Sequence, residues 1–290
     1  MKIGVMGLPY HAKILCEQLN QEGIDAFLIE ISISKYFKGV RQADIIHSYS
    51  TPISYKAFAI AKLLNRKVVH HWIGSDVLRV LQDKRLRLKA KIANRFVDKH
   101  FALSPYLVDE LSSVGIESIC IPAVPRNLTF ETPPLPQRLT VLTYLPDKKP
   151  GFYGSKIIYK LAEELRDAKF LVVAGTGEGQ QKLPNVEYLG WVTDMVSIYH
   201  RSSALVRILE HDGQSLMVLE ALAKGRHVIY NYQIPHCHYA TDFEGALEIL
   251  ERIKSNPEVN VAGSEFVRTK FNQKTIIGNI KQIYDSLLTK

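Results

Sequence analysis

Residues 206–229 combine residue types and spacing that could bind an anion. An apolar strand-like run leads into a polar turn, Ser215 is a favourable N-cap, and Gly225 suits the position just beyond a helix end. At the start of this helix, the backbone N–H groups of residues 213–216 would be free to bind a phosphate. The sequence therefore predicts an anion site at the start of a helix.

A helix start is too weak to hold a diphosphate by itself. It contributes about 0.3–1 kcal/mol, and at most about 2 kcal/mol, to binding an anion. A neighbouring cation is therefore required. The candidates are Arg207, Lys148 and Lys149, and the sequence leaves the choice among them open.

The same segment resembles the donor-binding motif of the retaining, metal-independent glycosyltransferases of family 4, which have the GT-B fold. In that motif two acidic residues flank seven others, and Asp212 and Glu220 hold these positions here. The resemblance implies that Glu220 binds the ribose hydroxyls of a nucleotide and that Asp212 contacts hydroxyls of the donor sugar. Most relatives have Glu where Asp212 stands. Phosphate or sugar oxygens would bind the backbone of Gly213, Gln214, Ser215 and Leu216.

The resemblance also assigns a glycine-rich turn, residues 175–179, to the border of the donor site. Gly175 would lie in this turn, and Gly190 would begin a loop beside the nucleotide base. Trp191 is either a platform for the base or a packing residue. A dinucleotide-binding turn is disfavoured, because the glycines do not follow the G-x-G-x-x-G spacing.

Three residues of the first half are expected near the transferred group. In the family a glycine-rich loop after the first strand faces the donor phosphate and the acceptor, and Gly7 matches it. His11 follows in this loop and is either an acceptor-side residue or a surface histidine. His71 precedes a Gly-Ser-Asp turn where relatives often have His-Gly-Thr-Asp. It is favoured as a catalytic histidine over a core histidine with satisfied hydrogen bonds.

The stretch of residues 79–95 is strongly basic, with seven Lys or Arg and one acidic residue among interleaved aliphatic side chains. It is either a solvated helix face or a surface for an anionic membrane or a lipid-phosphate acceptor, with Arg85 and Lys89 as representative contacts. Nucleic acid is disfavoured because no aromatic platform accompanies the charge. Residues 236–238, His-Cys-His, lack a second ligand cluster, so no metal site is expected.

Short apolar runs alternate with amphipathic stretches along the chain, which is typical of parallel sheets buried on both faces. Strands are expected at residues 2–6, 26–31, 45–48, 68–72, 100–103, 118–121, 139–144, 170–174, 186–189, 204–209 and 227–230. Helices are expected at residues 11–22, 53–65, 77–97, 105–114, 154–166, 193–201, 215–224, 242–254, 260–271 and 273–288.

This alternation predicts an α/β protein with two doubly wound, Rossmann-like domains facing each other across a cleft, as in the GT-B fold. The first domain is expected at residues 1–127, with the C-terminal helix 273–290 packed back on it. A proline-rich stretch, residues 128–137, is expected to be the hinge. The donor-binding domain would then comprise residues 138–272.

Composition places the chain among ordinary globular proteins. Its 290 residues are 46% apolar and 23% charged, and no apolar run approaches the roughly 20 residues that span a bilayer. The three cysteines are widely spaced, which favours reduced thiols and a cytoplasmic location, with peripheral contact at the inner face of the membrane as an open alternative.

The expected function is transfer of a sugar from a nucleotide-diphosphate sugar to a glycan, lipid-linked or small-molecule acceptor, with retention of configuration. No cofactor or metal is expected, and the partners are the nucleotide sugar and the acceptor. A sugar-nucleotide epimerase on the same fold and a catalytically silent nucleotide-sugar-binding protein are the alternatives. A dehydrogenase ranks last, because the dinucleotide fingerprint is poor.

Overall fold

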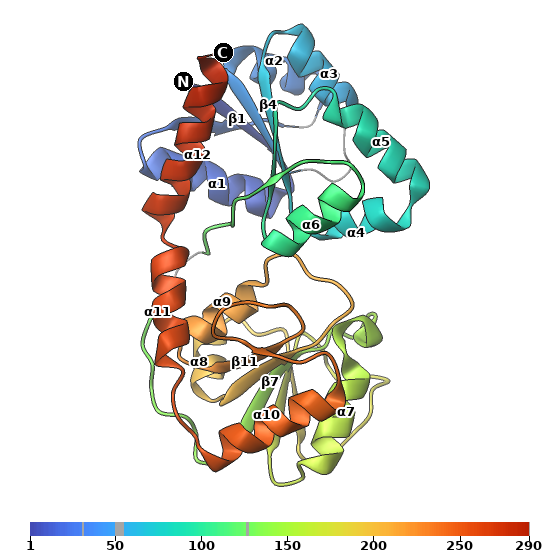
Figure 1. The fold of residues 1–290 in the computed structure, drawn as a ribbon, viewed down its shortest axis with the longest axis vertical. Helices are drawn as coiled ribbons and strands as arrows, with labels where there is room; N and C mark the ends of the chain where they lie inside the picture. Colours follow the sequence, from blue (N-terminus) through green and yellow to red (C-terminus); the bar gives the residue numbers. More distant parts are fainter. Residues whose placement is uncertain (31, 50–54, 126–127, 290) are drawn as a thin grey trace. The chain divides into compact units, whose positions relative to one another are not determined.

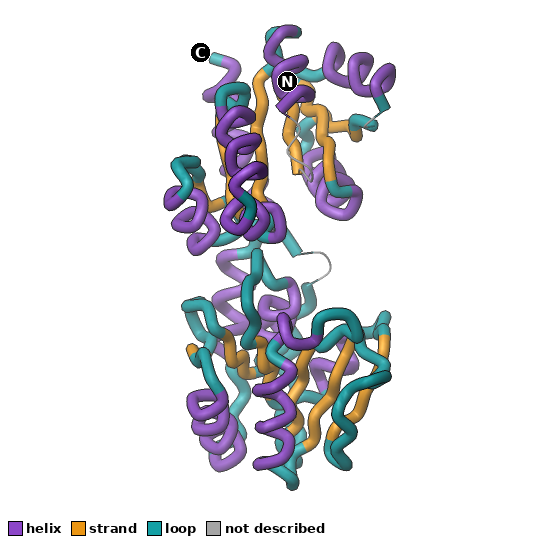
Figure 2. The backbone as a smooth tube through the Cα atoms, turned by 90° about the vertical axis from the view of Figure 1, so that its right-hand side faces the viewer, coloured by secondary structure: helices purple, strands orange, loops and turns teal. Residues whose placement is uncertain are grey.

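A computed structural model describes the whole chain except residues 31, 50–54, 126–127 and 290. The chain divides into two units: unit 1 is Met1–Arg126 with Phe271–Lys290, and unit 2 is Asn127–Lys270. Each unit holds one six-stranded sheet with helices packed around it (Figures 1 and 2). The domain boundary expected at residue 127 lies outside the described residues.

The sheet of unit 1 is entirely parallel, in the strand order β2-β1-β3-β4-β5-β6. Its strands are β1 (Lys2–Gly7), β2 (Asp25–Leu28), β3 (Ile45–Tyr49), β4 (Lys67–Trp72), β5 (Lys99–Ala102) and β6 (Ile119–Cys120). The chain reverses its direction of progress across the sheet between β1 and β3. Ligands of such sheets bind beyond the carboxyl ends of the strands at this switch point.

Helices cover both faces of this sheet. They are α1 (Pro9–Gln21), α2 (Ile33–Gln42), α3 (Tyr55–Leu63), α4 (Ser75–Gln82), α5 (Lys84–Asn94), α6 (Pro105–Ser113) and α12 (Gln273–Leu288). On one face, Leu19 of α1 and Ile277 of α12 pack in a cluster with Val5 of β1. A second cluster joins Val40 of α2 and Phe58 of α3 with further strand residues. Helix α12 is therefore part of the core of unit 1.

The sheet of unit 2 is also parallel throughout, in the order β12-β11-β10-β7-β8-β9. Its strands are β7 (Thr140–Tyr144), β8 (Lys169–Val173), β9 (Val186–Gly190), β10 (Ala204–Arg207), β11 (His227–Tyr230) and β12 (His238–Tyr239). Strands β7 and β10 flank the switch point here, so their carboxyl ends mark the expected ligand edge of this unit.

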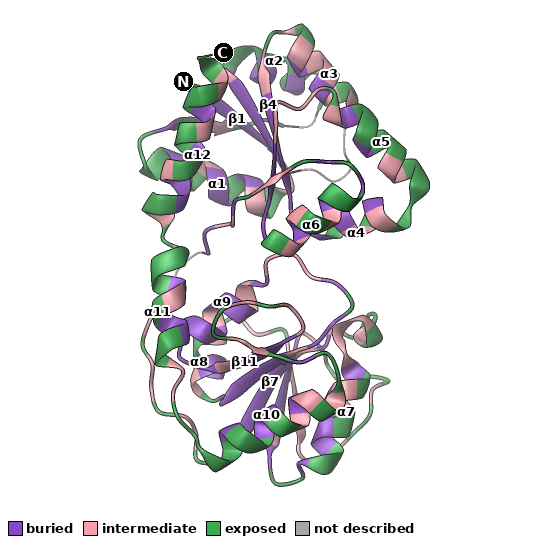
Figure 3. Ribbon diagram, viewed as in Figure 1, coloured by how far each residue is buried: buried purple, intermediate pink, exposed green. Residues whose placement is uncertain are grey.

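The helices of unit 2 are the 3₁₀ helix η1 (Pro150–Tyr153), α7 (Ser155–Glu164), α8 (Met195–His200), α9 (Leu216–Ala223), α10 (Phe243–Ser255) and α11 (Val261–Lys270). Leu161 of α7 and Leu250 of α10 belong to one buried cluster with Val141 of β7. Helix α9 buries most of its side chains and packs beside β10, β11 and α11. The strands are buried while the outer helix faces are exposed (Figure 3).

The proline-rich stretch before β7 is bound to unit 2. The Lys224 ammonium contacts the Thr129 hydroxyl and forms an ion pair with Glu131 at 2.6 Å. The buried Arg226 guanidinium donates to the carbonyl oxygens of Pro133 and Pro134. The role of residues 128–137 as a hinge stays a prediction.

The parallel α/β architecture confirms the expected fold class, but four elements differ from the prediction. Helix α2, the 3₁₀ helix η1 and the two-residue strand β12 were not expected. The expected helix at residues 77–97 is two helices, because Asp83 is extended between them and its carboxylate caps α5. The final residue of the strand expected at 26–31 and the start of the helix expected at 53–65 lie outside the described residues.

Candidate functional site

The switch point of unit 2 brings Arg207 beside two tyrosines at the carboxyl ends of neighbouring strands. Arg207 ends β10 and is the register partner of Tyr230, which ends β11. Its guanidinium carbon lies 5.9 Å from the ring centre of Tyr144, which ends β7. The arginine therefore occupies the position at which ligands of parallel sheets bind.

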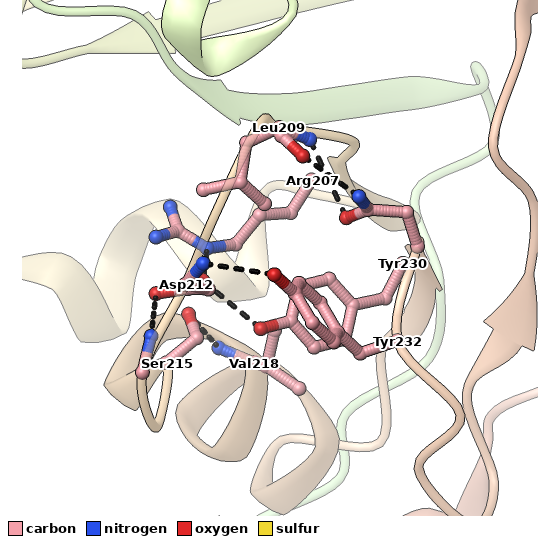
Figure 4. Close-up of polar contacts among 9 residues, drawn as sticks. Arg207, Leu209, Asp212, Ser215, Val218, Tyr230 and Tyr232 are labelled. Atoms are coloured by element: carbon pink, nitrogen blue, oxygen red, sulfur yellow. Dashed lines mark hydrogen bonds and ion pairs between the residues drawn. The ribbon is translucent and has the colours of Figure 1, made fainter. Parts of the chain in front are cut away.

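Arg207 forms an ion pair with Asp212 within this edge (Figure 4). Arg207 Nε donates to Asp212 Oδ2 over 2.7 Å, and the two side chains are only 13% and 12% exposed. Burial alone would lower the pKa of the guanidinium, but the Asp212 carboxylate, with smaller contributions from Tyr230 and Tyr153, raises that pKa overall. Arg207 is therefore held as a cation.

The terminal nitrogens of Arg207 are available to a ligand. Neither Nη1 nor Nη2 has a hydrogen-bond partner among the residues that the structure describes. Figure 4 shows them pointing away from Tyr230 and Tyr232. Because a guanidinium presents its N–H groups in a fixed fork, this geometry suits phosphate oxygens.

Asp212 is held from several sides. The Tyr230 hydroxyl donates to Asp212 Oδ2 at 2.9 Å, and the backbone N–H of Gly213 donates to Oδ1 at 2.9 Å. The Asp212 N–H itself donates to the Tyr232 hydroxyl at 3.1 Å. The carboxylate thus orients Arg207, and its contact with a donor sugar stays a prediction.

Helix α9 begins next to this ion pair. Ser215 caps the helix, since its hydroxyl accepts from the N–H of Val218. The N–H groups of Leu216 and Met217 are left without a partner in the described part of the chain. Of the expected anion-binding N–H groups, that of Gly213 is already used by Asp212. The free donors therefore lie in the first turn of α9.

Glu220 lies in α9 and is oriented by a tyrosine from another helix. The Tyr199 hydroxyl of α8 donates to Glu220 Oε2 at 2.6 Å. Burial raises the pKa of the Glu220 carboxyl, while the Tyr199 hydrogen bond opposes that shift. The other oxygen, Oε1, has no partner among the described residues and can accept from a hydroxyl group.

The loop that carries Lys148 and Lys149 is tied to the glycine-rich turn. Asp147 accepts hydrogen bonds from the N–H and the hydroxyl of Thr176. A Cβ atom on Gly175 would lie 2.2 Å from the Leu145 carbonyl oxygen, so only glycine allows the two loops this close. Both lysines are exposed, and neither has an ion pair in the described structure. They remain candidates for the additional cation.

The loop after β9 also lies at this edge. Gly190 has a positive φ of 62°, and its N–H donates to the Gly175 carbonyl, so it borders the glycine-rich turn. Trp191 is 82% exposed. A side chain this exposed is not a packing residue of unit 2 and is available to a base, which stays a prediction.

Gly7 occupies the switch point of unit 1. It has a φ of 112°, and a Cβ atom there would lie 1.5 Å from the Tyr49 carbonyl oxygen. The next residue, Leu8, donates its N–H to that same carbonyl. The glycine therefore allows the loop after β1 to approach the end of β3, and its expected contact with a donor stays a prediction.

His71 is enclosed in the core of unit 1. Its Nε2 lies 2.8 Å from the Ile121 carbonyl oxygen, which can only accept, so Nε2 carries the proton. His71 Nδ1 then accepts from His47 Nε2 at 3.3 Å, and His47 Nδ1 accepts from the Tyr284 hydroxyl at 2.6 Å. Burial lowers the pKa of His71 to about 3. This geometry favours the alternative given above, a core histidine with satisfied hydrogen bonds.

The three acceptor-side residues lie in different surroundings. His11 is half-buried at the start of α1, stacks on the Tyr49 ring at 5.4 Å, and has its pKa lowered by burial. Arg85 and Lys89 are exposed on α5. His11 follows β1, whereas Arg85 and Lys89 lie between β4 and β5, and β3 separates β1 from β4 in the sheet.

Sequence reasoning missed the tyrosines that orient the two acids. Tyr230 could have been found, because it ends a strand that neighbours β10 and so meets Arg207 in a parallel register. Tyr199 gave no such signal, because a helix–helix contact brings it to Glu220. Asp147 was likewise missed, since its partner Thr176 is 29 residues away.

No helix in the described ranges is long and apolar enough to cross a bilayer. No group of three or more His, Cys, Asp or Glu side chains outside the gaps is arranged to hold a metal ion.

Comparison with known protein families identifies the central part of unit 2. Residues 143–242 match the family model described as "Glycosyl transferases group 1". This range contains Arg207, Asp212 and Glu220. This part of the chain is similar to a glycosyltransferase domain, in agreement with the predicted transferase enzyme. A sequence search of curated proteins finds no match.

Three solved structures of similar fold are distant from this chain in sequence. The Anabaena protein Alr3699/HepE in complex with UDP is 14% identical, with a TM-score of 0.76, and the match covers 99% of this chain and 100% of that one. Sucrose-phosphate synthase from Thermosynechococcus elongatus is 16% identical, with a TM-score of 0.74, covering 100% and 99%. The lipopolysaccharide outer core galactosyltransferase WaaB is 13% identical, with a TM-score of 0.73, covering 99% of each chain. The expected GT-B fold is confirmed.

Proposed function

We propose that this protein transfers a sugar from a nucleotide-diphosphate sugar to an acceptor hydroxyl, with retention of the anomeric configuration. The observation that carries the proposal is the edge of the unit 2 sheet. There a guanidinium with unused N–H donors lies beside the free first-turn N–H groups of α9, and the same helix carries Glu220 with an unused oxygen. Together they offer donors to a diphosphate and an acceptor to a ribose.

Arg207 would bind the diphosphate mainly by placing its N–H donors in fixed directions, and less by adding net positive charge. Its pairing with Asp212 cancels the charge of the pair, so the guanidinium supplies two N–H groups at fixed positions. The leaving diphosphate also needs positive charge to offset its own. We assign that part to Lys148 or Lys149, whose loop Asp147 fixes against the glycine-rich turn.

The donor we favour is a UDP-sugar. Alr3699/HepE, which shares the fold, has been solved with UDP and with UDP-glucose. Glu220 Oε1 would accept from a ribose hydroxyl while Tyr199 holds Oε2. Trp191 would offer its exposed ring to the base.

Retention of configuration is part of the proposal because the two acids of the donor motif already have other roles and do not act as a separate base. Asp212 is engaged by Arg207, Tyr230 and Gly213, and Glu220 is assigned to the ribose. The leaving phosphate would then assist removal of the acceptor proton. The contribution of the protein is to position the reactants and to stabilise the developing charge.

Calorimetric titration with UDP, UDP-glucose and other nucleotide diphosphates tests the donor site. Arg207→Gln is expected to weaken UDP binding about 10–150-fold, the range for hydrogen bonds to a charged group. Arg166→Gln is a matched control, since Arg166 is exposed on the same unit and, among the described residues, its guanidinium bonds only to the Glu163 carbonyl. Equal affinities of the two variants for UDP would overturn the assignment of Arg207.

Turnover tests the reaction class. Release of UDP from UDP-glucose should depend on an added acceptor, and the anomeric configuration of the product should be that of the donor by NMR. Conversion of the donor to an epimer without an acceptor would favour the epimerase alternative. Tight UDP binding without turnover on any acceptor would favour a silent nucleotide-sugar-binding protein.

A further inference from the structure

Helix α5 presents an outward face in which an apolar ridge lies between two rows of cations. Leu88 and Ile92 form the ridge, one helical turn apart, and are 61% and 36% exposed. At 3.6 residues per turn, the cations fall on both sides of it: Lys84, Lys91 and Arg95 on one side, Arg85 and Lys89 on the other. We name these seven residues the α5 cationic face.

The buried side of α5 is opposite this face. Ala90 and Ala93 are the residues that α5 buries against unit 1, and their small side chains allow close packing. The outward residues are exposed, as the surface colouring of α5 shows (Figure 3). The ridge and the cations therefore do not contribute to the core.

The charge of the α5 cationic face is not compensated within the protein. None of its five cations forms an ion pair in the described part of the chain. The nearest acid in sequence, Asp83, is occupied by the N–H groups of Arg85 and Leu86. By contrast, Lys62 on the neighbouring helix α3 is paired with Asp98 at 2.8 Å.

The neighbouring helices also expose unpaired cations and an aliphatic side chain. Helices α3 and α4 both pack against α5. Lys56 of α3 and Arg79 of α4 are exposed and have no ion pair among the described residues, and Leu63 at the end of α3 is one of the most exposed apolar side chains. A surface of three helices thus combines cations with aliphatic side chains.

This combination is costly without a partner. Like charges four residues apart, such as Arg85 and Lys89, destabilise a helix. The apolar surface of Leu88 is also exposed to water, which is unfavourable compared with burial. At a bilayer the aliphatic ridge would enter the interfacial region, while the long cationic side chains reach lipid phosphates on either side. A nucleic acid would use the cations alone, because no aromatic ring lies on this face to stack on bases.

We propose that the α5 cationic face docks unit 1 on an anionic lipid bilayer. Each cation near such a surface strengthens binding about fivefold, so two of them account for about 25-fold. This proposal is independent of the donor site, because vesicle binding is measured without donor or acceptor. Failure of one proposal therefore leaves the other in place.

The test is binding of the full chain to phosphatidylcholine vesicles with and without added phosphatidylglycerol. Wild-type protein is expected to float with the anionic vesicles and not with the neutral ones. The variant Lys89→Gln/Lys91→Gln removes one cation from each side of the ridge and should bind the anionic vesicles about 25-fold more weakly. Glutamine keeps the helix propensity and much of the side-chain length.

The matched control is Lys270→Gln/Lys274→Gln. These two lysines are also exposed and are not ion-paired in the described structure. Replacing them lowers the net charge by the same amount as the α5 variant. If binding depends on the α5 cationic face, the vesicle affinity of this control should stay within about twofold of wild type. If binding depends only on the overall charge of the protein, both variants should lose the same affinity. Equal weakening would overturn the proposal.

Leu88→Gln separates a bilayer from other polyanions. It changes no charge, so a bilayer that receives the ridge should lose several-fold affinity, in line with the burial of one aliphatic side chain. Heparin and duplex DNA serve as comparison ligands. Unchanged vesicle binding by Leu88→Gln, or tighter binding to heparin or DNA than to the anionic vesicles, would contradict the assignment of a bilayer. Thermal unfolding of all variants is expected to match wild type, since every changed side chain is exposed.

Discussion

One polar network in each unit can be compared, and the two networks differ in whether their groups are all paired within the protein. In unit 1, the proton donors run in a closed series from Tyr284 through His47 and His71 to the Ile121 carbonyl. In unit 2, Arg207 bonds to Asp212 through Nε, and Glu220 bonds to Tyr199 through Oε2. The other nitrogens of the guanidinium and the other oxygen of the carboxylate have no partner among the described residues. Two parallel six-stranded sheets thus carry a closed and an open polar network.

The difference indicates which network serves stability and which serves a ligand. A buried polar group without a partner costs about 1–3 kcal/mol, so a closed series lowers the free energy of the folded state. An open network keeps donors and acceptors that only a ligand can satisfy. The unit 2 site therefore depends on second contacts, such as those of Asp212 and Tyr199, to hold its open groups in place.

The largest expected effect comes from breaking the Arg207–Asp212 pair. Asp212→Ala leaves a mostly buried guanidinium unpaired, and we expect the free energy of unfolding to fall by about 3–5 kcal/mol in urea denaturation. Asp285→Ala is the control, because it removes an exposed i,i+4 pair with Lys281 that contributes about 0.3–0.5 kcal/mol. Equal stabilities of the two variants would show that the internal pair is not formed.

Removing Glu220 tests the open acceptor of unit 2. Glu220→Ala is expected to weaken binding of UDP and of UMP by the same factor, about 10–150-fold, because both nucleotides carry the ribose. Arg207→Gln should instead weaken UDP more than UMP, since it acts on the diphosphate. Glu164→Ala, an exposed acid on α7, is the control in titration calorimetry. A loss for UDP alone in Glu220→Ala would contradict a ribose contact.

Acid should weaken the closed network of unit 1. Burial lowers the pKa of His71 from 6.5 to about 3. The unfolded chain therefore binds this proton at a higher pH than the folded chain, so the stabilisation is complete above pH 6.5 and is lost as the pH falls toward 3. At pH 5 this residue alone should lower the free energy of unfolding by about 2 kcal/mol.

Hydrogen exchange followed by mass spectrometry can assign that loss to a unit. His47 has its pKa lowered well below 6.5 by burial and by neighbouring histidines, so it adds to the effect. After correction for the intrinsic exchange rate, amides of β3 and β4 should lose protection between pH 7 and pH 5 before those of β10 and β11. Earlier loss in unit 2 would reverse the comparison between the two networks.

Most of the fold could be predicted from the sequence, because buried parallel strands are apolar runs and the helices between them are amphipathic. The exceptions depend on tertiary contacts. Helix α2 contains Gly39, an unfavourable helix residue, yet a Cβ atom there would lie 3.0 Å from Ile29, so glycine is what allows the packing. Strand β12 is only two residues long and pairs solely with β11.

The candidate site was predictable only where its parts are close in sequence. Arg207, Asp212 and Glu220 lie within one strand–turn–helix segment, so their proximity follows from local structure. His71 shows the limit of such reasoning. Strand periodicity places its side chain on one face of the sheet, but the partners that enclose it, His47 and Tyr284, come from a neighbouring strand and a distant helix.

The smallest expected effect concerns the group that orients Glu220. Tyr199→Phe removes one hydroxyl and leaves the carboxylate, so UDP binding should weaken only about 2–12-fold, as for one hydrogen bond of about 0.5–1.5 kcal/mol. Because that hydrogen bond opposes the burial-raised pKa of Glu220, its loss should shift the carboxyl pKa further upward. UDP affinity should then begin to fall at a higher pH in the variant than in wild type. Tyr188→Phe is the control, since the Tyr188 hydroxyl contacts Tyr159 and the Gln181 carbonyl rather than Glu220. A Tyr199→Phe variant with weaker UDP binding but an unshifted pH profile would mean that the tyrosine only packs against α9 and does not set the state of the carboxylate.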